Sequence, residues 1–344
     1  MGLPFRDLVR PQEVGWDRLA GRTLAVDAYN AIYQFLATIR QSDGRPFSDA
    51  SGRVTSHLIG VLYRTTALLG EGVLPVWVFD GRPPDLKSGT LRARFEAKQK
   101  AEDQWQQALE AGDLETARKK AAATSRLTRP MADEARALLA ALGVPAVQAP
   151  SEGEAQASAM AARGQVWAAA SEDYDALLFG APRLVRGLAA RGRRGVNSGA
   201  LIIDRAELLE QLGIDGEELL LIGLLVGTDF NDGAKGYGPK RALKLVREHL
   251  GWDATLRKAR IDPSEVAPVA ELFRHPDVTE VAMPSFGPVD EAAVDRLLVE
   301  GHGFSPDRVR SAIGRARRRP PPTAAPSEAK GHQTLIEAFG GNSG

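Results

Sequence analysis

The residues of this chain most able to do chemistry are seven acids set in the short motifs VDAYN, VFDG, SEGEA, SEDYD and GTDF. They are Asp27, Asp80, Glu152, Glu154, Asp173, Asp175 and Asp229. Carboxylate oxygens without histidine or cysteine favour Mg²⁺ or Mn²⁺ over Zn²⁺ or Cu²⁺. So much negative charge in one cleft would raise several pKa values unless cations balanced it. Two divalent ions about 4 Å apart activate water and stabilise a leaving oxygen, so the acids predict phosphodiester hydrolysis.

Each acid, taken alone, also fits a purely structural role. Ser151 and Glu154 match the S-x-x-E capping box, and Asp27, Asp80 and Asp173 could each begin a helix or a turn. For any single acid, capping explains the residue at least as well as metal binding. Capping gives no reason, however, for paired acids at two sites and single acids at three others, and this pattern favours a shared site.

Four apolar runs predict the strands that would position these acids: residues 23–26, 74–79, 145–148 and 166–170. Segments of helical period separate the runs, which is the alternation that builds a parallel sheet covered on both faces. Three of the runs stop at or just before acids, and the run at 145–148 is followed by the SEGEA pair. Because the active crevice of an open α/β sheet lies beyond the carboxyl ends of its strands, we expect the acids to converge.

Composition sets the class of protein. The 344 residues suggest two domains or one large one, and 43% hydrophobic against 26% charged residues excludes global disorder. Forty-four basic residues balance 44 acidic ones, which excludes a uniformly basic coat. The absence of cysteine excludes disulfides, thiolate nucleophiles and cysteine-based zinc fingers. With no signal core and no apolar stretch long enough to span a bilayer, we expect a soluble intracellular protein without a membrane partner.

Several long motifs, in order along the chain, carry a family resemblance. They include VDAYNAIYQFLATIRQ, PVWVFDGRPPDLKSG, QAPSEGEAQASAMAARG, ASEDYDALLFGAPRLVR and LVGTDF followed by KGYGPKRA. The sequence resembles the flap structure-specific endonucleases of archaea and eukaryotes, within the XPG/Rad2 nuclease group. The likeness runs from about residue 20 to 250 and weakens to about 314.

The resemblance implies a fold class and a domain plan. The fold is α/β, a mostly parallel central sheet covered by helices (a PIN-like nuclease core), with a helical arch and a helix-turn-helix DNA-binding hairpin. The plan begins with a nuclease domain at 1–314, which consists of an N-terminal region at 1–86, an arch at about 87–136, an internal region at 137–226, a DNA-binding hairpin at about 227–260 and C-terminal helices. A basic, proline-rich linker at 315–331 and a tail at 332–344 follow.

The same resemblance assigns roles at the site. All seven acids occupy the family's metal-ligand positions, with Asp27, Asp80, Glu152 and Glu154 organising one Mg²⁺ and Asp173, Asp175 and Asp229 the other, and with Mn²⁺ as a substitute. Lys87 and Arg94 match a basic pair that contacts the scissile phosphate, and with Asp173 they make up the catalytic set. Their spacing of seven predicts one shared helix face. As bare sequence, both cations would be ordinary solvated charges.

DNA-contacting positions follow from the resemblance as well. Gly236, Gly238, Lys240 and Arg241 match a turn that grips one duplex strand and, in the family, holds K⁺; glycines let backbone N–H groups approach phosphate. Tyr33 and Arg40 match positions around the cleavage junction, where an aromatic beside a cation can stack a base. Tyr29 has no such support and is assigned to the margin of the core.

The tail resembles a motif that docks on the sliding clamp PCNA. One register uses Gln333, Ile336 and Phe339 with Gly340 in place of a second aromatic; a register shifted by one uses Leu335 and Phe339 and loses the glutamine. A short apolar cluster on a tether suits peptide docking. The alternative is an unstructured chain end.

The function implied is a monomeric, metal-dependent endonuclease that removes 5′ flaps from branched DNA in replication and repair, with 5′ exonuclease activity and a 5′-phosphate product. A relative acting mainly as an exonuclease, or on bubbles or gaps, is a second possibility. A catalytically silent junction binder or clamp-associated scaffold is a third, from another class, and it would be expected to have lost some of the acids.

Overall fold

The computed structural model describes the chain except for residues 1–2, 4, 112, 189–198 and 318–344. Its centre is a seven-stranded sheet of order β1-β7-β6-β5-β2-β3-β4. The strands are β1 (Gln12–Val14), β2 (Thr23–Asp27), β3 (Leu74–Phe79), β4 (Ala146–Gln148), β5 (Ala168–Ala170), β6 (Arg183–Arg186) and β7 (Ala200–Asp204). The pairs β4–β3, β3–β2, β2–β5 and β5–β6 are parallel, whereas β7 is antiparallel to β6 and to β1. The four predicted strands are confirmed, while β1, β6 and β7 were not predicted.

Alternating side chains of the strands feed two cores, one on each face of the sheet. On β2, Leu24 and Val26 join one core and Ala25 joins the other. This period of two is what a strand buried on both faces requires.

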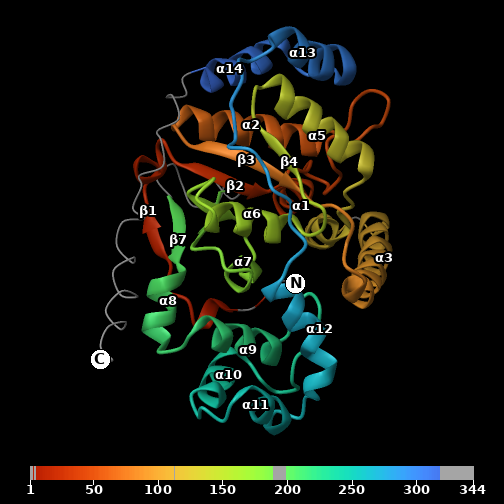
Figure 1. Ribbon diagram of the computed structural model, residues 1–344. Coiled ribbons are helices and arrows are strands. Elements are labelled where there is room, and N and C mark those ends of the chain that lie inside the picture. Colours follow the sequence, from red (N-terminus) through yellow and green to blue (C-terminus); the bar gives the residue numbers. More distant parts are fainter. Residues whose placement is uncertain (1–2, 4, 112, 189–198, 318–344) are drawn as a thin grey trace, which may run out of the picture.

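Helices cover both faces, as Figure 1 shows. The first core holds α1 (Ala28–Thr38), α2 (Ser56–Gly70), α5 (Arg129–Ala141), α13 (Glu291–Asp295) and α14 (Pro306–Ala316). The second holds α6 (Gly153–Ala162), α7 (Asp175–Leu178), α8 (Arg205–Leu212) and α9 (Gly216–Val226). The predicted α/β class is therefore confirmed.

The charged segment predicted as an arch forms two helices beside the sheet. The short helix η3 (Asp85–Lys87) leads into α3 (Ser88–Glu110), and α4 (Leu114–Ala121) returns to the short helix η4 (Ala122–Thr124). Asp113 caps α4 by accepting a hydrogen bond from the Thr116 N–H, which marks the start of the second helix. The backbone of the pair is described, but the side chains of 88, 90–94, 109, 114, 117 and 118 are not. Trp105, Ala108 and Ala121 form the small core that joins α3 to the returning chain.

Below the sheet in Figure 1 lies a helical module made of α9, α10 (Pro239–Val246), α11 (Trp252–Lys258) and α12 (Pro263–Arg274). Gly236 has a φ of 83°, and Gly238 is the N-cap of α10. The predicted glycine turn before a helix is therefore present. In the described part of the chain, no helix is both long and apolar enough to cross a membrane.

Candidate active site

The structure brings all seven predicted acids to one cleft of about 490 Å³. The cleft lies beyond the carboxyl ends of the parallel strands, where the strand pattern places it. Side chains of α1, the start of the arch, its returning leg, and α6, α7 and the chain after α9 complete its wall. The convergence of the acids is thus a property of the fold.

Asp27 ends β2, where it caps α1 and also lines the cleft. Its Oδ1 accepts from the Asn30 N–H at 2.9 Å, which caps α1. Its Oδ2 accepts from the Ser171 hydroxyl at 3.4 Å. The residue is 8% exposed, and it still lines the cleft. Capping therefore fixes the direction of the carboxylate without removing it from the site.

Two glycines allow the chain after β3 to approach the start of α6. A Cβ on Gly81 would lie 2.3 Å from the carbonyl oxygens of Ala149 and Pro150. A Cβ on Gly153 would lie 2.6 Å from Asp80 Oδ1, to which the Gly153 N–H donates at 2.9 Å. Only a glycine permits such contacts, so these positions bring Asp80 against the SEGEA segment.

Glu154 does not form the capping box that Ser151 suggests. The N-cap of α6 is Glu152, and no side chain caps it. Among the described residues, Glu154 Oε1 and Asp175 Oδ1 are buried oxygens without a hydrogen-bond partner. Burial, and then the neighbouring carboxylates, raise the pKa of both groups well above the usual range. Buried acceptors with no donor are what a cation-binding site requires.

Asp173 is held by backbone donors. Its Oδ1 accepts from the Leu3 N–H at 3.0 Å and from the Tyr174 N–H at 2.8 Å. Burial and the charge of Asp229 raise the pKa of Asp173, and these two donors oppose the rise. The amino-terminal segment therefore takes part in orienting this carboxylate, a contact that no pattern in the sequence indicates.

Asp27 and Asp80 also have raised pKa values. Burial raises the pKa of Asp27 to about 6, with Asp173 and Glu152 adding to the rise. Burial raises the pKa of Asp80 to about 8, with Asp27 and Glu152 adding to it. Without added cations, the cleft therefore retains protons that exposed carboxylates would release at neutral pH.

Lys87 places an ammonium group among the carboxylates of the cleft. Its Nζ lies 2.5 Å from Glu152 Oε2 and 3.7 Å from Asp229 Oδ2. Burial lowers the pKa of Lys87, but these carboxylates more than offset it, so the pKa rises. Lys87 ends η3, which leads directly into the α3 helix that carries Arg94, and their shared helix face stays a prediction. The Arg94 side chain is outside the described residues.

The donor set fits hard divalent cations. Every ligand candidate is a carboxylate, and two buried oxygens lack partners in the described part of the chain. As they stand, no three described acidic or histidine side chains are close enough to enclose one ion. The Lys87 ammonium lies between two of these carboxylates, those of Glu152 and Asp229.

Two tyrosines of α1 line the cleft, whereas the arginine that follows the helix does not. Tyr33 lines the cleft, and the Lys98 ammonium lies 4.5 Å from the centre of its ring. Tyr29, which the sequence assigns to the core margin, also lines the cleft and packs edge-on against Phe79. Arg40 is not among the cleft-lining residues, and its guanidinium donates to protein acceptors.

The four residues assigned to the glycine turn do not line the acidic cleft. Lys240 and Arg241 are exposed at the start of α10. The Arg241 guanidinium lies 4.4 Å from the centre of the Tyr237 ring and donates to the Gly236 carbonyl at 3.2 Å. The four tail residues Gln333, Leu335, Ile336 and Phe339 lie outside the described residues.

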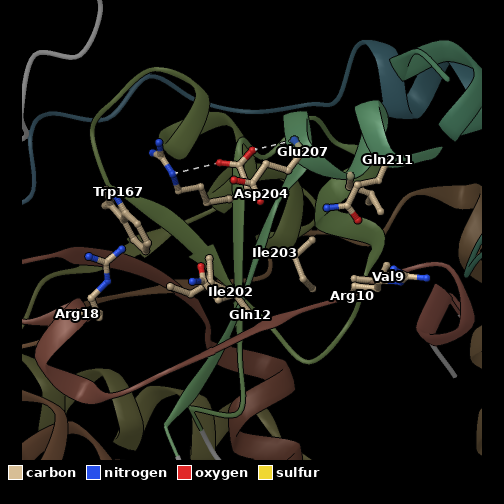
Figure 2. Close-up of a pocket in the computed structure, with 12 residues that line it drawn as sticks. Val9, Arg10, Gln12, Arg18, Trp167, Ile202, Ile203, Asp204, Glu207 and Gln211 are labelled. Carbon is tan, nitrogen blue, oxygen red and sulfur yellow. Dashed lines mark hydrogen bonds and ion pairs between the residues drawn. The ribbon is translucent and has the colours of Figure 1, made fainter. Parts of the chain in front are cut away.

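A second hollow, of about 150 Å³, opens at the amino ends of the parallel strands β5 and β6 (Figure 2). Trp167, before β5, and Asp204, at the end of β7, form part of its wall. Arg183 lies 5.2 Å from the centre of the Trp167 ring and 3.6 Å from Asp204. None of the seven acids contributes to this hollow, which sets it apart from the cleft.

Comparison with known proteins agrees with this geometry. Residues 5–101 match the XPG N-terminal domain, and residues 143–229 match the XPG I-region. Flap endonuclease 1 of Aeropyrum pernix is 47% identical over 329 residues, covering 92% of this chain and 94% of the relative. Flap endonuclease 1 of Pyrococcus horikoshii is 43% identical, covering 92% and 94%.

Solved structures show the same likeness. Flap endonuclease-1 from Methanococcus jannaschii superimposes with a TM-score of 0.74 at 39% identity, over 92% of this chain and 98% of that one. The catalytic core of Rad2 in complex with a DNA substrate shares the fold, with a TM-score of 0.68 at 23% identity over 91% and 99% of the two chains. With both XPG regions present and relatives this similar over almost the whole chain, the protein belongs to the flap endonuclease family of XPG nucleases.

Proposed function

We propose that the acidic cleft hydrolyses a DNA phosphodiester at the junction between a 5′ single-stranded flap and duplex DNA, in replication and repair. The observation that carries this proposal is the convergence of all seven acids on one cleft at the base of the helical arch. Membership of the flap endonuclease family, whose nucleases depend on metal ions, supports the same substrate class and the same chemistry.

The proposed cofactors are two Mg²⁺ ions, for which Mn²⁺ would substitute. Asp27, Asp80, Glu152 and Glu154 would hold mainly one ion; Asp173, Asp175 and Asp229 would hold mainly the other. Such ions supply Lewis-acid activation of water and stabilisation of the leaving oxygen. The unpartnered buried oxygens of Glu154 and Asp175 support this assignment.

The protein itself contributes orientation and charge. Backbone N–H groups of Asn30, Gly153 and Leu3 fix three of the carboxylates, so little reorganisation accompanies substrate binding. The Lys87 ammonium would move from Glu152 to the scissile phosphate, and the Arg94 guanidinium would contact the same phosphate. A cation already inside the cleft, at 2.5 Å from a carboxylate, supports this role for Lys87.

Selection of the substrate would be geometric. A free 5′ end can enter the arch, whereas the interior of a duplex cannot, so no base-edge recognition is expected. Tyr33 would stack a base at the junction, after Lys98 leaves its ring. Gly236, Gly238, Lys240 and Arg241 would hold the duplex backbone, with K⁺ bound at the turn.

Further proposals concern the ends of the chain and its setting. The nuclease domain would extend to residue 314, and the linker at 315–331 would tether the tail. Gln333, Leu335, Ile336 and Phe339 would dock on PCNA. The enzyme would act as a monomer inside the cell, where its DNA substrate is found.

The test is cleavage of an end-labelled 5′ flap with and without Mg²⁺, alongside nicked, bubble and blocked-end substrates. We expect metal-dependent cutting that leaves a 5′ phosphate, with the flap cut fastest. Stronger cutting of nicks or bubbles would favour the exonuclease or bubble-acting alternative. Binding without cutting in Mg²⁺ or Mn²⁺, equal in wild type and Asp173→Ala, would favour the silent junction binder.

A further inference from the structure

Arg40, two residues beyond the end of α1, joins its own neighbourhood to a segment 85 residues further along the chain. Its Nε donates to the Leu36 carbonyl and its Nη1 to the Gly44 carbonyl, both at 2.8 Å. Its Nη2 donates to the Ser125 hydroxyl at 2.9 Å and lies 3.5 Å from the Thr124 hydroxyl. The guanidinium therefore connects α1 and the following loop to residues 122–125, which we call the exit leg of the arch.

The hydroxyls of the exit leg are arranged as acceptors for this arginine. Thr124 Oγ1 donates to the Ala121 carbonyl at 2.8 Å, and Ser125 Oγ donates to the Ala122 carbonyl at 3.1 Å. Each hydroxyl has one proton, so the side facing Arg40 can only accept. Both residues are 8% exposed, so water could replace the Arg40 guanidinium as donor only if the exit leg moved away from α1.

The exit leg is part of the wall of the catalytic cleft, whereas Arg40 is behind it. Ala122, Ala123 and Ser125 line the same cleft as the seven acids, and Arg40 does not. Burial lowers the pKa of Arg40, and the charge of Glu102 on α3 opposes this effect. Arg40 thus bonds to one leg of the arch, is within the electrostatic influence of Glu102 on the other, and is not part of the cleft lining.

We propose that Arg40 is a positioning residue, which fixes the exit leg against α1 and so sets the shape of the cleft wall, and that it does not contact a DNA phosphate. The proposal rests on the flap endonuclease function proposed above, because it assigns the arch a role in placing the flap. An arginine is required, since a lysine ammonium cannot donate to the Leu36 and Gly44 carbonyls and to the leg at once.

Kinetics and binding separate positioning from phosphate contact. We expect Arg40→Lys and Ser125→Ala each to slow single-turnover flap cleavage by about tenfold, since a small misplacement near the reacting groups is costly. The double variant should be no slower than the worse single variant, because both changes break one connection. A wild-type cleavage rate in Arg40→Lys would overturn the proposal. So would a double variant in which the losses of rate from the two single variants are fully additive.

Salt dependence of DNA affinity gives a second readout. Arg40→Met removes the charge, and we expect the slope of log affinity against log salt to stay that of the wild type. Loss of one phosphate contact would instead lower the slope by about 0.9 and overturn the proposal. Arg45→Met is the matched control, because Arg45 lies on the same loop and its exposed guanidinium pairs with Asp43.

A measurement without DNA separates this proposal from the proposed function. The chain has no cysteine, so spin labels can be placed at two introduced cysteines, Glu115→Cys on α4 and Asp307→Cys on α14. Their side chains are 81% and 88% exposed, so labelling should leave the fold intact. We expect a narrow distance distribution that broadens with Arg40→Met but not with Arg45→Met. An unchanged distribution in Arg40→Met would refute the positioning role, whether or not the wild type cleaves flaps.

Discussion

Neutralising one acid of the cleft should stabilise the metal-free protein, and Asp80→Asn tests this most cleanly. Asn keeps the Oδ1 that accepts from the Gly153 N–H, so it removes charge while preserving shape. Burial, with the charges of Asp27 and Glu152, raises the pKa of Asp80 from 3.8 to about 8. The folded state therefore holds a proton that the unfolded chain releases above pH 3.8, and stability contributed by this group falls as pH rises from about 4 to about 8.

At pH 7 this difference corresponds to about 4 kcal/mol of unfavourable folding free energy, at 1.36 kcal/mol per pKa unit. The neighbouring carboxylates readjust their protonation when Asp80 becomes neutral, so we expect Asp80→Asn to raise the free energy of unfolding by about 2 kcal/mol. For a chain of 344 residues that gain raises Tm by about 3 °C.

The assay is thermal unfolding in excess chelator at pH 5 and pH 8, with the exposed Asp277→Asn as control. The gain should be larger at pH 8, and it should be replaced by a loss relative to wild type when Mn²⁺ is added. A destabilised metal-free Asp80→Asn, or an equal gain at both pH values, would refute the electrostatic reasoning.

Two further outcomes follow from the same structure. Mn²⁺ affinity should rise between pH 6 and pH 8, because the pKa values of Asp27 and Asp80 are raised to about 6 and about 8 and their protons must leave before metal binds. Titration calorimetry in buffers of different ionisation enthalpy measures the protons released. An affinity that does not change with pH would contradict this prediction. Lys240→Ala and Arg241→Ala should each lower the salt slope of flap binding by about 0.9 with little change in single-turnover rate at saturating enzyme, and an unchanged slope would remove these residues from the DNA interface.

The central strands and the meeting of the acids could be predicted from the sequence because both follow from simple patterns. The runs around β2 and β3 are continuous apolar segments, and an acid directly follows or ends each one. Parallel strands then bring those acids to a single edge.

The antiparallel half of the sheet could not be predicted in this way. In β6, Leu184 and Val185 are adjacent and both buried, because one faces each core. The strand has only four residues, with arginines at both ends, and so shows neither a long apolar run nor alternation.

Contacts between distant segments were also beyond sequence reasoning. The position of Lys87 between Glu152 and Asp229 depends on how η3 sits against α6. The hydrogen bond from Arg40 to Ser125 spans 85 residues, and only the packing of the arch against α1 creates it. Resemblance placed Arg40 near the junction, but its donors are oriented by packing that no local pattern encodes.

The central claim is that the seven carboxylates form one site for a pair of divalent cations. Electron paramagnetic resonance of Mn²⁺ added to the chelator-treated protein counts the bound ions directly. Two ions per chain in wild type, falling when Asp175→Asn removes one of the buried carboxylates, is the predicted result. A titration that shows no specific Mn²⁺ binding, or a stoichiometry unaffected by Asp175→Asn, would contradict the claim.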